Sequence, residues 1–79
     1  LIVEDDEVSD LYLQKIMKPF ADSIVSTWSG KEAIKILQEH HDIDVVLMDM
    51  KMHHMDGYQT TAEIRKFNQD IIIIAQTAY

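Results

Sequence analysis

The chain has 79 residues and no cysteine, and its 14 acidic residues outnumber 7 basic ones, giving a net charge of −7. A chain of this length forms one small domain at most, and the lack of cysteine excludes disulfides and thiolate chemistry. The acidic balance argues against direct binding of nucleic acid or an anionic membrane, because both bind basic surfaces. It is compatible with a bound divalent cation. No apolar run could span a bilayer and no signal peptide is visible, so a cytoplasmic location is the default expectation.

The chain opens on Leu1–Val3, which we expect to be the end of a short apolar strand. The start in mid-strand, without methionine, indicates a piece excised from a longer protein. Four acids follow, and two of them, Glu4 and Asp5, precede the next helix. Because crowded carboxylates repel one another unless a cation is near, we assign these two a functional role.

The first helix is predicted at Val8–Lys18 and ends before Pro19. Its apolar residues recur at helical spacing and would face the core; they are Val8, Leu11, Tyr12 and Ile16. A short strand is expected at Ser23–Ser26. The second helix begins at Gly30 after the N-cap Ser29, in a capping-box pattern with Glu32.

A central strand is predicted at Ile43–Met48, and it runs directly into Asp49. A loop and the third helix, Gly57–Phe67, follow, and then the strand Ile71–Ala75. Both strands are unbroken apolar runs, which is typical of strands buried on both faces of a parallel sheet. Strands alternating with helices predict an α/β fold, with right-handed crossovers between parallel strands.

Polar side chains stand at three of the predicted strand ends: Glu4 and Asp5, then Asp49, then Thr77. The carboxyl ends of parallel strands share one edge, so these groups can converge there. Carboxylates crowded at that edge suit Mg²⁺, which binds one or two of them and keeps several waters. From the residues alone, Asp49 could be a metal ligand, a nucleophile toward phosphorus, or a cap for the following turn.

These motifs together resemble the receiver domain of two-component response regulators. The resemblance is carried by the acidic pair Glu4-Asp5, by Val45-Val46-Leu47-Met48-Asp49 with Met52 and Met55-Asp56-Gly57, and by Thr77-Ala78. It covers residues 1–79 and implies a flavodoxin-like, CheY-like doubly wound sheet of order 2-1-3-4-5. The chain would supply the first four strands and three helices of a five-unit receiver, and would be incomplete at its C-terminus.

The resemblance also implies roles for individual residues. Asp49 would accept a phosphoryl group from phosphohistidine on a histidine kinase or histidine phosphotransfer domain. Asp5, Asp49 and the backbone carbonyl of Lys51 would bind Mg²⁺, with Glu4 acting through water. Thr77 would be the switch hydroxyl. Lys51 and Tyr79 would flank the path of the hydrolytic water.

Two departures from the family pattern stand out. His53 occupies the position after Met52 where the family usually has proline, and the freedom gained predicts a more mobile loop. The chain ends before the family's fifth strand, so the family's lysine at the end of that strand has no counterpart here. Without the fifth strand and its neighbouring helices, Ile71–Ala75 would be an exposed apolar edge. We therefore expect the isolated chain to form a homodimer by swapping, or to aggregate.

Three readings of function compete. The favoured one is a phosphorylatable receiver, either of a stand-alone regulator or of a hybrid histidine kinase. The segments around Met55 and Ala75 resemble receivers of hybrid kinases more than those of transcription factors, which favours the hybrid. The second is a phosphatase of the haloacid dehalogenase type, which needs an aspartate where this chain has Lys51. The third is a receiver-like interaction module that is never phosphorylated, against which the acidic pair, Asp49 and Thr77 argue.

Overall fold

The computed structural model describes residues 1–76 of the chain. Four parallel strands form one sheet in the order β2-β1-β3-β4, so the predicted α/β class and strand order are confirmed. The strands are β1 (Ile2–Val3), β2 (Ser26–Thr27), β3 (Val45–Asp49) and β4 (Ile72–Gln76). The helices are α1 (Glu7–Met17), the short 3-10 helix η1 (Lys18–Phe20), α2 (Gly30–Glu39) and α3 (Gly57–Arg65).

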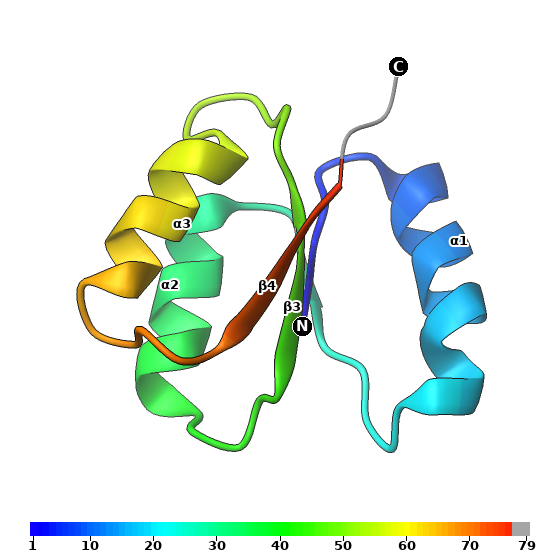
Figure 1. Cartoon of the computed structure of the whole chain (residues 1–79). Helices are drawn as coiled ribbons and strands as arrows, with labels where there is room; N and C mark the ends of the chain where they lie inside the picture. The colour runs from blue at the N-terminus through cyan, green and yellow to red at the C-terminus, as the bar shows by residue number, and fades with distance from the viewer. Residues whose placement is uncertain (77–79) are drawn as a thin grey trace.

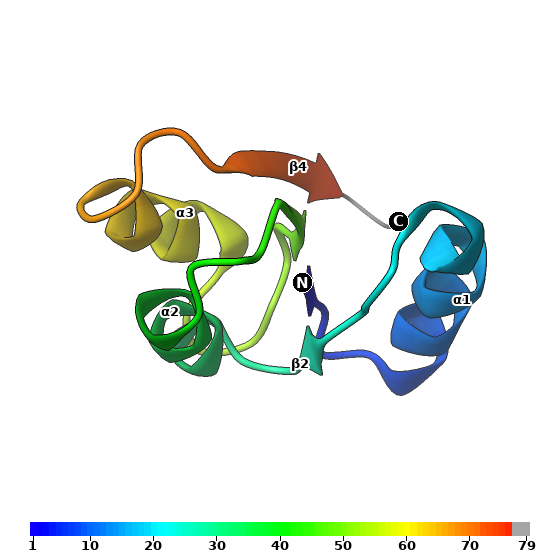
Figure 2. The ribbon, with the colours of Figure 1, turned by 90° about the horizontal axis from the view of Figure 1, so that it is seen from below.

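The helices form layers on the two sides of the sheet (Figure 1). α2 and α3 lie side by side on one face, and α1 lies alone on the other, as Figure 2 shows from below. None of the helices within residues 1–76 has the length and apolar character needed to cross a membrane.

The main core lies between the sheet and the α2–α3 layer. Val46 and Met48, alternate residues of β3, are fully buried there, together with Ala33 and Ile64 from the two helices. Alternation follows from strand geometry, which points every second side chain to the same face. The close approach of the helices depends on Gly30, since a Cβ at this position would collide with the side chain of Thr60.

Each of the three α-helices begins at a capping side chain that the sequence places at its start. Asp6 caps α1 by accepting from the Ser9 amide, and Ser29 caps α2 by accepting from the Glu32 amide. At α3 the cap is a complete capping box between Asp56 and Gln59. These bonds satisfy amides that the first helical turn leaves without partners.

The predicted apolar face of α1 is wrong. Val8, Leu11, Tyr12 and Ile16 are exposed, and the buried residues of α1 are Asp10 and Leu13. The reason is a polar network between α1 and β2. Ser26 donates to Asp10 at 2.7 Å, and Gln14 donates to both Asp10 and Ser26 at 3.1 Å.

Two strand predictions also need correction. The second strand is Ser26–Thr27 rather than Ser23–Ser26, because these residues pair with Ile2 and Val3 of β1. β4 is not buried on both faces: Ile72 and Ile74 are exposed, while Ile73 packs against the core. Among the described residues β4 pairs with β3 alone, and α1 does not cover it.

Candidate metal centre

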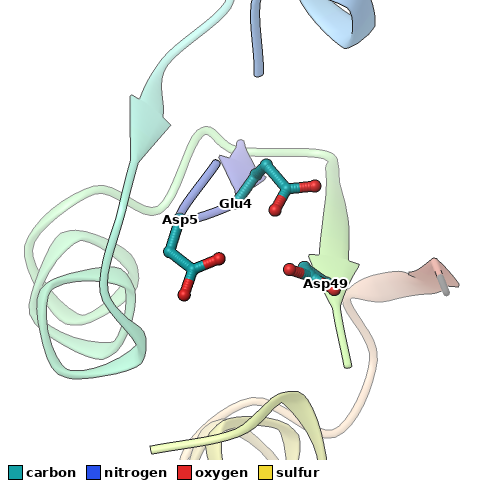
Figure 3. Close-up of side chains that lie close together, drawn as sticks. All are labelled: Glu4, Asp5 and Asp49. Atoms are coloured by element: carbon teal, nitrogen blue, oxygen red, sulfur yellow. The ribbon is translucent and has the colours of Figure 1, made fainter. Parts of the chain in front are cut away.

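Three carboxylates converge at the carboxyl edge of the sheet (Figure 3). Glu4 and Asp5 directly follow β1, and Asp49 is the last residue of its neighbour β3. One oxygen from each side chain lies within 4.8 Å of the others. The parallel pairing of Val3 with Met48 explains this convergence, because it brings the two strand ends to the same level. We refer to Glu4, Asp5 and Asp49 as the acidic trio.

The members of the trio differ in their exposure to solvent. Glu4 and Asp49 are only 3% and 7% exposed, whereas Asp5 is half-buried. Burial, and after it a hydrogen bond to Asp49 and the charge of that residue, together raise the pKa of Glu4 to about 7. Removing carboxylates from water while they repel one another disfavours the charged form, so the site has a strong electrostatic demand for a cation.

Each carboxylate of the trio accepts a hydrogen bond from a backbone amide. The Asp6 amide donates to Glu4 at 3.3 Å, and the Lys51 amide donates to Asp49 at 3.0 Å. The third donor is the amide of His53, which reaches Asp5 at 3.0 Å across 48 residues of sequence. These bonds fix the orientation of the side chains, as outer-sphere partners do around metal ligands.

The loop after Asp49 is held close to the strand end. Gly57 begins α3 directly against the Asp49 carbonyl and Met50, and a Cβ at this position would collide with both. On the other side, the Met50 amide donates to the Gln76 carbonyl at 3.1 Å, and Gln76 pairs in register with Asp49. Asp49 is therefore fixed from both α3 and β4.

The donor set fits a hard divalent cation. Carboxylate oxygens are the ligands that Mg²⁺ and Ca²⁺ prefer, and Mg²⁺ needs only one or two of them beside waters. The half-buried Asp5 leaves a route from solvent. No histidine or cysteine joins a three-residue metal cluster in the described part of the chain, so the trio does not resemble a zinc site.

The predicted site residues have different outcomes. Glu4, Asp5 and Asp49 are brought together as expected. The backbone amide of Lys51 donates a hydrogen bond to Asp49. That the backbone carbonyl of Lys51 binds the metal stays a prediction. Thr77 and Tyr79 lie outside the described residues. Sequence reasoning missed the amide of His53, and the only available signal was the absence of proline at that position.

The family model named response regulator receiver domain matches residues 1–79. The chain belongs to this family. Its relatives include "Probable histidine kinase 6" of Oryza sativa subsp. japonica, 35% identical over 66 residues. They also include "Transcription factor SKN7" of Saccharomyces cerevisiae, 35% identical over 77 residues. The alignments cover 84% and 98% of this chain but only 7% and 12% of those proteins. This receiver thus spans a small fraction of the curated relatives it matches.

Solved structures agree with the family assignment. The MaeR response regulator bound to beryllium trifluoride superposes with a TM-score of 0.87 at 26% identity, covering 99% of this receiver and 65% of that chain. A mutant receiver domain of the histidine kinase CKI1 from Arabidopsis thaliana gives a TM-score of 0.78 at 30% identity, over 94% and 61% of the two chains. Receivers of both kinds, from response regulators and from histidine kinases, share this fold.

Proposed function

We propose that this receiver takes a phosphoryl group from phosphohistidine onto Asp49, with Mg²⁺ bound by the acidic trio. The observation that carries the proposal is the convergence of Glu4, Asp5 and Asp49 at the strand edge. A carboxylate that ends a buried strand beside two further acids can serve as a nucleophile only when a cation offsets the repulsion. Bound Mg²⁺ would neutralise charge that develops on the transferred phosphoryl group.

The chain's own residues divide the work of the transfer. An oxygen of Asp49 forms a bond to phosphorus while the phosphorus–nitrogen bond of phosphohistidine breaks, and the imidazole leaves with the electron pair. The Lys51 amide holds one Asp49 oxygen at 3.0 Å and so orients the other for attack. Asp5 and Asp49 would hold the ion directly, the Lys51 carbonyl would add a third protein ligand, and Glu4 would act through water. For Thr77, the switch-hydroxyl role rests on the family resemblance.

The phosphodonor would be a histidine kinase or a histidine phosphotransfer domain. Histidine kinases among the relatives support this choice, and they support placing the receiver in a hybrid histidine kinase. The similarity to a transcription factor keeps the stand-alone regulator as the second context. Measuring phosphotransfer rates from a panel of autophosphorylated kinases would rank the donors.

Intact-mass analysis tests the proposed chemistry. The receiver would be incubated with phosphoramidate or acetyl phosphate and Mg²⁺, beside an Asp49→Asn variant and a sample with EDTA. We expect a labile gain of one phosphoryl group that both controls lack. No gain in a sample shown to be folded by circular dichroism would contradict the proposal and favour the interaction module. Turnover of a generic phosphate ester would instead revive the phosphatase.

A further inference from the structure

The three amides that bind the acidic trio differ in origin. The amides that donate to Glu4 and Asp49 belong to residues two places further along the same segment. The amide on Asp5 comes from His53, in the loop between β3 and α3 on the other side of the trio. Among the side-chain hydrogen bonds of the trio within residues 1–76, this one alone joins the β1–α1 segment to the β3–α3 loop.

Asp5 is the most exposed member of the trio, so neighbouring atoms restrict its side chain least. It is half-buried, whereas Glu4 and Asp49 are enclosed by neighbouring atoms. An exposed carboxylate on a loop samples several rotamers, and ordering it on metal binding costs conformational entropy. A hydrogen bond that fixes one oxygen of the carboxylate presents the other in a defined direction before the ion arrives.

We propose that the backbone amide of His53 is a positioning group that sets Asp5 for metal binding and couples the β3–α3 loop to the ion. The proposal rests on the function proposed above, in which Asp5 is a ligand of Mg²⁺. The imidazole takes no part in this role. Any residue with an amide N–H at position 53 can fill it, and proline cannot, because its ring nitrogen carries no hydrogen.

The same bond changes the expected behaviour of the loop. With histidine in place of the family's usual proline, the sequence predicted a more mobile loop, but the structure attaches this loop to Asp5. The loss of the proline constraint is thus offset by a charge-assisted hydrogen bond, which is stronger than one between neutral groups. Binding of the ion and order in the loop would then increase together.

The first test compares His53→Ala with His53→Pro by isothermal titration with MgCl₂. His53→Ala keeps the amide, and we expect its Mg²⁺ affinity to match that of the natural chain. His53→Pro removes the donor, and we expect an affinity about tenfold lower, the lower end of the range for outer-sphere partners of metal sites. Equal affinities for the two variants would overturn the proposal. No Mg²⁺ binding by the natural chain would instead show that the proposed function itself fails.

A single-atom change separates the donor from any effect of the proline ring. Lactic acid incorporated at position 53 replaces the amide N–H by an ester oxygen, and its matched control is His53→Ala. We expect the ester to lower Mg²⁺ affinity like proline while urea unfolding of the metal-free protein changes little. A loss of stability with unchanged affinity would assign the bond a purely structural role and overturn the proposal. Amide exchange by NMR gives an ion-free check, since the His53 amide proton, which is bonded to Asp5, should exchange more slowly than that of the neighbouring His54.

Discussion

On the α2–α3 face of the sheet, Val46, Met48 and Ile64 are completely buried, and the contact is apolar. On the α1 face, the contact with β2 passes through a hydrogen-bonded network centred on Asp10, and Leu13 is the buried apolar residue of the helix. One face is therefore held by close packing and the other largely by polar bonds. Apolar packing is non-directional, whereas a buried polar network needs every partner in place.

The two faces also differ in how much apolar surface they leave open to contact with other molecules. The interface between the sheet and the α2–α3 layer is closed to solvent, whereas β4 exposes apolar side chains on its α1 side, and α1 exposes several of its own. The acidic trio lies at the edge of the sheet that both faces share. Substitutions on the packed face should thus act through folding, and those on the α1 face through polar bonds or through contacts with other molecules.

Truncating the packed face should have the largest effect. Ile64→Ala removes a side chain with no exposed surface, and we expect a loss of about 2–5 kcal/mol in the free energy of unfolding. For a small domain this approaches the whole stability. The matched control, Leu11→Ala on the α1 face, removes a side chain that is 59% exposed and should cost less than about 0.5 kcal/mol. Urea unfolding measures both, and equal losses would refute the distinction between the faces.

The free energy of unfolding should depend on pH through Glu4, at the sheet edge that the two faces share. Its pKa is raised from 4.5 to about 7, so the folded chain binds more protons than the unfolded chain between these values. The stabilising contribution is therefore complete below pH 4.5 and is lost as pH rises through about 7. In EDTA we expect the free energy of unfolding to fall over this window, by at most about 3 kcal/mol. Glu4→Gln should remove this dependence, and an unchanged slope in that variant would contradict the assignment.

The polar network on the α1 face should show its directional character in a double-mutant cycle. Asp10→Ala leaves Ser26 and Gln14 without their buried partner, and we expect a loss of about 1–3 kcal/mol. Adding Ser26→Ala should then cost much less than it does alone, because the bond is already absent. Additive losses would mean that the two side chains contribute independently and that the network is not a unit.

The exposed part of the α1 face should affect association more than folding. Ile74 is 49% exposed on β4, an edge strand among the described residues, and such edges pair with other chains. We expect the 79-residue chain to self-associate at micromolar concentrations in sedimentation velocity. Ile74→Lys should restore a monomer while changing the free energy of unfolding by only about 0.5 kcal/mol. A natural chain that sediments as a sharp monomer would refute this expectation.

The sequence was sufficient to predict a parallel sheet and the convergence of the acidic trio at its edge. Asp49 ends an apolar run and Glu4 follows another, and parallel pairing makes their convergence a consequence of topology. The inward face of α1 could not be predicted in this way, since the spacing of Val8, Leu11 and Tyr12 competes with the buried bonds of Asp10. Periodicity measures side-chain polarity alone, and it carries no information on which polar groups find partners.

The amide donors around the trio were also beyond prediction. Every residue except proline offers the same backbone N–H, so the sequence of the loop does not show that His53 will reach Asp5. Likewise, Ile24 and Val25 look more strand-like than Ser26 and Thr27, but the pairing with β1 selects the latter. In both cases the path of the chain in space, rather than residue type, decides which backbone groups meet.

The bond from the His53 amide to Asp5 also has an evolutionary consequence. Histidine and proline codons differ at their middle base alone, so a point mutation can add or remove this donor without altering any side chain of the acidic trio. Receivers could thereby diverge in the ion concentration at which they respond while their reactive groups stay the same. Selection would act on a backbone hydrogen atom, which a comparison of catalytic side chains between paralogues would overlook.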